Sequence, residues 1–132
     1  EQAKEDKAVD QFYRSYPGIG ALSARILSNE LSDLSRFNNE RELFSYTGLT
    51  PTEYSSGETR RQGGITHQGK SVVRKILVQC AWVTIRHDKR MREFFERIKA
   101  RSGAKRAIVA VAKKLIGWIR CSFINGELYR VM

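Results

Sequence analysis

Three consecutive segments in the second half of the chain, residues 70–87, 88–98 and 105–124, carry apolar residues at helical spacing. Each segment has one broad apolar face and one charged face, which is typical of a helix that packs on a protein core. The third is the most apolar and is predicted to be the core helix. No stretch alternates for long as a strand would. The sequence therefore predicts a mainly α fold, built as a single compact helical domain.

The same periodicity assigns side chains to the inside or the outside of the fold. The inward positions are predicted to be Val73, Ile76, Leu77, Cys80, Ala81 and Thr84, then Met91, Phe94, Phe95 and Ile98, then Ile108, Val111, Leu115, Ile119 and Phe123. Arg90, Arg92, Arg97 and Lys99 are predicted to point outward. Arg106, Lys113 and Arg120 are seven residues apart, so they share one side of the third helix. Ser102-Gly103 should separate the second and third helices, and Asn125-Gly126 should end the third.

The charge of the chain is strongly asymmetric. The 132 residues have a net charge of +10, yet residues 1–58 hold six basic and ten acidic residues, whereas residues 59–120 hold seventeen basic and three acidic ones. A basic surface of this kind indicates a polyanion partner, usually nucleic acid; a solvated basic surface with no partner is the alternative. The longest apolar run, residues 107–112, is far too short to span a bilayer, and no signal-peptide pattern is present.

Cys80 and Cys121 are the only cysteines. Both lie in apolar helical patterns, so both are predicted to be buried, reduced thiols. Neither a disulfide framework nor a metal-ligand spacing is present, which fits a reducing cytoplasm.

A hairpin is predicted in the first half of the chain. Residues 3–16 have the pattern of a helix end, Pro17 stops that helix, and Gly18 and Gly20 permit a tight turn. Ile19, Leu22 and Ile26 would then share one face of a second helix. The run Tyr16-Pro17-Gly18-Ile19-Gly20, with Ala24 four residues after Gly20, resembles the helix-hairpin-helix motif, although Tyr16 stands where leucine is usual. The resemblance implies that the amides at Gly18 and Gly20 meet a DNA phosphate. A corner that only packs is the alternative, because Asp10, Glu30 and Asp33 oppose DNA.

A short helix and a polar loop are predicted next. Asn38 or Asn39 can cap the helix, Leu43, Phe44 and Tyr46 form its apolar side, and Gly48 should stop it. Residues 52–66 are polar and rich in glycine, and both a loop and a short hairpin fit them.

This glycine- and serine-rich stretch carries the candidate chemistry. Ser55 and Ser56 lie beside Gly57, and a serine hydroxyl there could attack a phosphodiester if cations offset the charge on the phosphate. Arg60, Arg61, Lys70 and Arg74 are the candidate phosphate clamps, and His67 is the one nearby candidate for a general base. A turn serine with solvated arginines is the alternative. The acidic residues are scattered over helix surfaces, so no metal site is predicted in this chain.

The order of these motifs resembles one family. The proline-glycine hairpin, residues 46–51, Ser56-Gly57, residues 64–66, Gly69, Arg74 and residues 110–115 together resemble the C-terminal transposase domain of the DEDD-type insertion-sequence transposases, the "one-ten" group. The resemblance extends over residues 16–129. It implies that residues 1–15 end a helical linker and that residues 16–132 form the serine-bearing, DNA-binding domain.

The resemblance also implies function. In this family a serine, here Ser56 with Ser55 as the neighbouring alternative, bonds covalently to DNA during recombination. An N-terminal RuvC-like domain holds magnesium on four acidic residues, and this chain would be inactive without it. A structured guide RNA, a homo-oligomer and a location at the bacterial nucleoid in the cytoplasm are further expectations. Two other interpretations stay open: a non-enzymatic helix-hairpin-helix module that binds nucleic acid, and a structural domain that dimerises through apolar helices.

Overall fold

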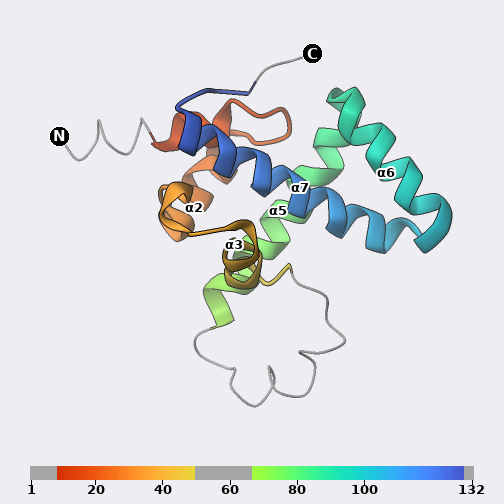
Figure 1. Ribbon diagram of the computed structural model, residues 1–132, viewed down its shortest axis with the longest axis horizontal. Coiled ribbons are helices and arrows are strands. Elements are labelled where there is room, and N and C mark those ends of the chain that lie inside the picture. The colour runs from red at the N-terminus through yellow and green to blue at the C-terminus, as the bar shows by residue number, and fades with distance from the viewer. Residues whose placement is uncertain (1–8, 50–66, 130–132) are drawn as a thin grey trace.

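The computed structural model describes residues 9–49 and 67–129, without the side chains of residues 67–71. Residues 9–14 are helical and lead into α2 (Ala21–Leu31), a short 3-10 helix η1 (Leu34–Arg36) and α3 (Glu40–Thr47). After the described chain resumes, α5 (His67–His87), α6 (Lys89–Ser102) and α7 (Ala104–Asn125) follow one another (Figure 1). The described ranges contain no strand, which confirms the predicted mainly α fold and the single compact helical domain.

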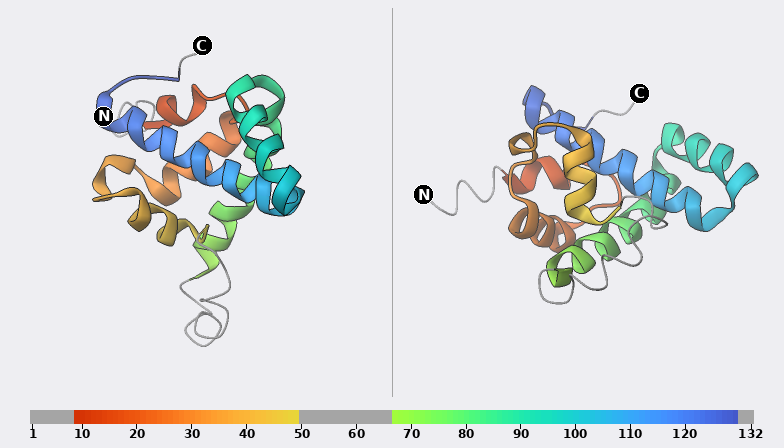
Figure 2. Two further views of the ribbon diagram at one scale, coloured as in Figure 1. Left: turned by 45° about the vertical axis from the view of Figure 1, so that its right-hand side comes forward. Right: turned by 60° about the horizontal axis from the view of Figure 1, so that its bottom comes forward.

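The centre of the fold is α7. This helix runs across the molecule and packs against α5, α6 and η1 (Figures 1 and 2). Its buried residues are Ala107, Ile108, Val111, Ala112, Leu115, Ile116, Gly117, Ile119 and Ser122. The predicted inward residues Ile108, Val111, Leu115 and Ile119 are therefore confirmed, and Phe123 is partly buried against the core. Because burial of apolar surface is the main stabilising contribution to a fold, α7 is the helix on which the others assemble.

The predicted apolar faces of α5 and α6 are also confirmed. On α5, Val73, Leu77, Cys80, Ala81 and Thr84 are buried and Ile76 is partly buried. On α6, Met91 and Phe95 are buried, while Phe94 and Ile98 are partly buried. Gly103, with φ of +91°, separates α6 from α7, and Gly126, with φ of +70°, follows the end of α7. Both turns lie where the glycines predicted them, because that backbone conformation is strained for other residues.

The helix α3 has the predicted caps. Asn39, rather than Asn38, is the N-cap, since its side chain accepts a bond from the amide of Glu42 at 2.9 Å. The backbone amide of Asn38 donates to the carboxylate of Glu42 at 3.3 Å. Gly48 ends the helix with φ of +74°.

The face predicted for the second helix is wrong in part. The helix α2 begins after Gly20, and its buried residues are Ala24, Leu27, Ser28 and Leu31. Ile19 is buried ahead of the helix, but Leu22 is 75% exposed. The buried residues at positions 24, 27 and 31 set the rotation of α2, and that rotation turns Leu22 away from the core.

Two side chains of the last two helices also differ from prediction. Cys121 is exposed, whereas Cys80 is buried as predicted. Cys121 lies two residues, or about 200° of helical rotation, from the buried Ile119, so it faces outward. Arg90 was predicted to point outward but pairs with the buried Asp88. Arg120, predicted only to share one side of α7 with Arg106 and Lys113, donates its guanidinium to the carbonyl of Phe37 at 3.1 Å.

Candidate nucleic-acid interface

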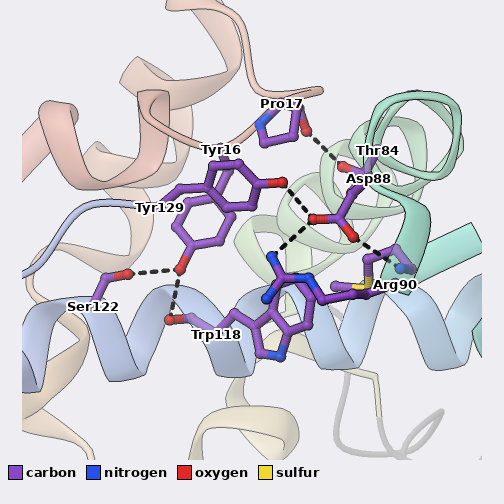
Figure 3. Close-up of polar contacts among 9 residues, drawn as sticks. Tyr16, Pro17, Thr84, Asp88, Arg90, Trp118, Ser122 and Tyr129 are labelled. Atoms are coloured by element: carbon purple, nitrogen blue, oxygen red, sulfur yellow. Dashed lines mark hydrogen bonds and ion pairs between the residues drawn. The ribbon is translucent and has the colours of Figure 1, made fainter. Parts of the chain in front are cut away.

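The hairpin at residues 16–20 packs on the C-terminal part of α5, at Cys80 and Thr84. The Thr84 hydroxyl lies 2.7 Å from the carbonyl oxygen of Pro17 (Figure 3). It also lies 2.8 Å from the carbonyl oxygen of Cys80, so it can donate to either. Gly18 has φ of +100°, and a Cβ atom there would lie 2.6 Å from the Thr84 hydroxyl oxygen and 2.7 Å from the Cys80 carbonyl oxygen. Both the backbone angle and the space therefore require glycine at this position.

Gly20 is in a different environment. It is exposed, it precedes α2 as the N-cap, and a Cβ atom there would have no neighbour within 4 Å. No side chain caps the first turn of α2, and that turn has no acidic residue. Of the two glycines predicted to meet a phosphate, Gly18 thus faces α5, whereas Gly20 faces solvent at the start of α2. The free amide groups and the dipole of a helix start favour an anion at such a position.

Tyr16 explains the departure from the usual leucine of the hairpin motif. Its side chain is buried, and its hydroxyl donates to the carbonyl of Trp118 at 2.9 Å and lies 2.6 Å from the Ser122 hydroxyl (Figure 3). Its ring packs against that of Tyr129, with centroids 4.9 Å apart. Burial raises the pKa of Tyr16, although the bond to Ser122 acts in the opposite direction. Tyr16 therefore fastens the hairpin to α7.

A second polar cluster lies beside it, at the corner between α5 and α6. The Asp88 carboxylate caps α6 by accepting from the amide of Met91 at 3.0 Å, and it also accepts from Arg90 at 3.1 Å and from the Tyr129 hydroxyl (Figure 3). Burial alone would raise the pKa of Asp88, but the bonds from Tyr129, Met91 and Arg90 outweigh it and lower that pKa. The Arg90 guanidinium also lies 4.6 Å from the centre of the Trp118 ring.

This cluster was not identified from the sequence. Tyr129 follows Gly126 outside any periodic helix, so no local pattern connects it with Asp88, which lies 41 residues earlier. The one available signal was that Asp88 precedes α6 as an aspartate at an N-cap position. The cluster holds Tyr129 beside the turn at residues 16–20, and its one cation, Arg90, is neutralised by Asp88.

The candidate phosphate clamps are only partly described. Ser55, Ser56, Arg60 and Arg61 lie outside the described residues, as does the choice between a loop and a hairpin for residues 52–66. His67 and Lys70 lie on the first turns of α5, where only the backbone is described.

Arg74 is the clamp residue whose side chain can be placed. It is exposed on α5, and its guanidinium lies 3.9 Å from where a Cβ atom of Gly48 would be. Gly48 ends α3. The next residue, Leu49, is buried and is the last one of the described range 9–49. The structure therefore brings Arg74 to the corner at which the described chain stops ahead of the serine pair. Its exposed guanidinium is free of contact with any carboxylate of the described residues and can bind a phosphate there.

Comparison with known proteins decides the family. A model of the Transposase IS116/IS110/IS902 family matches residues 10–96. The chain belongs to this transposase family. Its family match covers the hairpin, α2, α3, α5 and the start of α6, so the resemblance predicted from the motifs is confirmed.

Similar insertion-sequence proteins support the same assignment. The transposase for insertion sequence element IS1111A of Coxiella burnetii is 31% identical over 91% of this chain and 34% of its own length. The transposase for insertion sequence element IS1328 of Yersinia enterocolitica is 31% identical over 95% of this chain and 30% of its own. The putative transposase y4qE of Sinorhizobium fredii is 44% identical over 52% of this chain and 18% of its own.

The chain of this family member thus spans about a third or less of the length of these curated relatives. No solved structure matches it. In the described part of the chain, no helix has the length and apolar character needed to cross a membrane.

Proposed function

We propose that this chain is the part of an insertion-sequence transposase that binds DNA and supplies the Ser56 hydroxyl as the nucleophile for strand exchange in DNA transposition. The observation that carries the proposal is the corner between α3 and α5. In a chain that belongs to a transposase family, the exposed Arg74 lies beside Gly48, shortly before the segment that holds Ser56, Arg60 and Arg61. Arginine side chains suit this position because their planar guanidinium binds phosphate oxygens in a bidentate manner.

The chemistry would proceed at one phosphodiester. The Ser56 oxygen would attack the phosphorus, a new P–O bond would form, and the bond from phosphorus to one sugar oxygen would break. The serine proton would pass to a base, for which His67 is the candidate in this chain, and the departing sugar oxygen would take up a proton. Arg60, Arg61 and Arg74 would offset the negative charge that develops on the phosphate oxygens. Reversal of the step onto another strand would complete the exchange.

Other parts of the protein and its partners belong to the same proposal. The RuvC-like N-terminal domain would hold magnesium on its own acidic residues. The described residues of this chain do not fit that ion, since they offer no group of three or more histidine, cysteine or acidic side chains. A structured guide RNA and a second copy of the transposase would complete the assembly, which would act on the bacterial nucleoid.

The test is a Ser56→Ala variant of the full-length transposase, assayed with its DNA and RNA. We expect loss of the covalent protein–DNA product and of strand exchange, with folding and DNA binding nearly unchanged, since removing one hydroxyl is a small change. Ser55→Ala is the matched control and should recombine.

Two outcomes would overturn the assignment. Normal recombination by Ser56→Ala with an inactive Ser55→Ala variant would move the nucleophile to Ser55. Normal recombination by both variants would exclude a serine nucleophile here and favour the non-enzymatic binding module, whose exposed hairpin glycine is Gly20.

A further inference from the structure

The turn between α6 and α7 is a strongly positive surface of the described chain. These helices form a hairpin that extends from the body of the molecule, with its turn at the end far from α2 and α3 (Figures 1 and 2). Residues 97–114 contain seven basic residues and no acidic one. We call five of them the hairpin tip, namely Arg97, Lys99, Arg101, Lys105 and Arg106.

All five side chains of the hairpin tip are exposed. In residues 9–49 and 67–129, Arg25 pairs with Asp10 and Arg90 pairs with Asp88, and no ion pair joins a carboxylate of these residues to the tip. Glu93 and Glu96 are exposed earlier on α6 and pair with none of these cations. Five like charges this close repel one another and destabilise the free protein, which an anionic partner would reverse.

Aromatic rings hold part of this surface in place. The Arg97 guanidinium lies 5.7 Å from the centre of the Phe94 ring, and the Lys99 ammonium lies 5.9 Å from that of Phe95. The ammonium group of Lys114, which lies on α7, is 4.5 Å from the centre of the Phe94 ring of α6. Contacts of this kind position cations without cancelling their charge, so fewer rotamers are lost when the tip binds an anion.

The tip is remote from the proposed serine site. Gly117 of α7 lies beside Glu40 of α3. Gly103 lies fourteen residues earlier, directly before the start of α7. Fourteen residues of α-helix measure about 21 Å, so the tip lies about that far along α7 from the contact with α3, the helix that Gly48 ends. A duplex held at the corner of Arg74 and Gly48 would therefore reach the tip only with its flanking part.

We propose that the hairpin tip is a second DNA-binding surface, which holds the phosphate backbone of the duplex that flanks the site of strand exchange. The proposal rests on the DNA-binding function proposed above. Lysine and arginine are the side chains that contact phosphates. The small residues Ser102, Gly103 and Ala104 at the turn leave room for the DNA phosphate backbone to approach. Phe94 and Phe95 pack inward rather than forming an exposed stacking platform, which favours a duplex over a single strand.

The experiment compares two triple variants of the 132-residue chain with equal loss of charge. Arg101→Gln, Lys105→Gln and Arg106→Gln neutralise the tip, while Arg14→Gln, Arg41→Gln and Arg86→Gln neutralise three exposed arginines elsewhere. Binding to a 30-base-pair duplex is measured by fluorescence anisotropy over a range of salt concentrations, with circular dichroism as the test of folding. A third variant, Arg101→Lys with Arg106→Lys, keeps the charge.

We expect the tip triple to lower affinity by more than about tenfold and to reduce the salt dependence by about 2–3 in log–log slope, because each lost phosphate contact removes nearly one unit. The control triple should change affinity by less than about threefold, and the lysine variant should bind as the unchanged chain does. Equal weakening by both triples would overturn the tip proposal and leave the proposed function intact. A tip triple that, in the same anisotropy assay, loses affinity for single-stranded RNA but not for the duplex would also overturn the tip proposal. Failure of the unchanged chain to bind duplex at low salt would overturn both.

Discussion

Gly18 and Gly20 show how two residues of one motif take different roles. Gly18 is held against α5 by the contact of Thr84 with Pro17, and a side chain there would collide with backbone atoms. Gly20 stands at the open start of α2 with nothing near its Cβ position. The same sequence motif thus contains one glycine required by packing and one that leaves an exposed helix start accessible.

The two positions can be tested as a matched pair. We expect Gly18→Ala to lower the free energy of unfolding by about 2–4 kcal/mol, because the new methyl group meets backbone atoms in a backbone conformation that alanine disfavours. Gly20→Ala should change it by less than about 1 kcal/mol, since φ of −81° suits alanine and the space is open. Urea unfolding followed by circular dichroism measures both. Equal stability of the two variants would contradict the packing role of Gly18.

At the scale of elements, Tyr129 links the corner between α5 and α6 to Ser15 near the first described helix. The Tyr129 hydroxyl donates to Asp88, and the Tyr129 amide donates to the Ser15 hydroxyl at 3.0 Å. Arg92 donates to the carbonyls of Ile85 at 3.0 Å and Arg86 at 2.9 Å, which satisfies the end of α5. The segment after α7 is therefore bonded both to Ser15, which directly follows the helix at residues 9–14, and to the α5–α6 corner.

The charge of Asp88 makes this corner sensitive to acid. Its pKa in the folded chain is lowered from the ordinary value of 3.8, so its contribution to stability is present above that value and is lost as the pH falls through the folded pKa. Asp88→Asn keeps an amide oxygen that can cap α6 but removes the charge that Arg90 and Tyr129 bind. We expect the variant to be about 1–2 kcal/mol less stable at neutral pH.

The decisive comparison is the pH dependence. The stability difference between the unchanged chain and Asp88→Asn should shrink once the pH falls below about 4, because the protonated carboxyl then resembles the amide. Urea midpoints measured between neutral pH and acid give this difference directly. Parallel curves over the whole range would show that the Asp88 charge does not stabilise the fold.

At the scale of the whole molecule, the second half of the described chain is strongly basic, since residues 67–129 hold fifteen basic and four acidic residues, whereas residues 9–49 hold four basic and five acidic ones. The exposed cations of α5, α6 and the start of α7 include Arg74, Lys75, Arg92 and the hairpin tip, whereas the acidic residues concentrate before residue 59. Such a distribution attracts a polyanion to one part of the surface and orients it there.

We therefore expect binding to duplex DNA that depends strongly on salt and little on sequence. About four phosphate contacts would lower the affinity about 100-fold between about 50 and 200 mM salt, through release of counterions from the DNA. A scrambled duplex should bind within about fivefold of any other, since phosphate contacts carry no sequence information. Titrations by fluorescence anisotropy test this, and an affinity that stays constant with salt would contradict it.

The sequence by itself determined the long helices and the glycines that follow α3, α6 and α7, although α5 begins at residue 67 rather than 70 and α6 extends to residue 102 rather than 98. Apolar residues at a period of 3.6, Asn39 before α3, Asp88 before α6, and the glycines at positions 48, 103 and 126 are local signals, and each acts within one or two turns of the chain. The family also followed from the sequence, because motif order needs no coordinates. The serine pair and its neighbouring arginines are predictions of the same kind and lie outside the described residues.

Only the tertiary structure decided which neighbour each helix face meets. Gly18 faces Thr84 across 66 residues, Arg120 bonds to the carbonyl of Phe37, Arg90 turns toward Asp88 and the Trp118 ring, and Leu22 and Cys121 face outward. Helical periodicity assigns a side chain to a direction around its own axis, but the rotation and position of that axis are set by contacts distant in sequence. The separation of the hairpin tip from the corner of Arg74 and Gly48 has the same origin, since it depends on how α7 crosses α5.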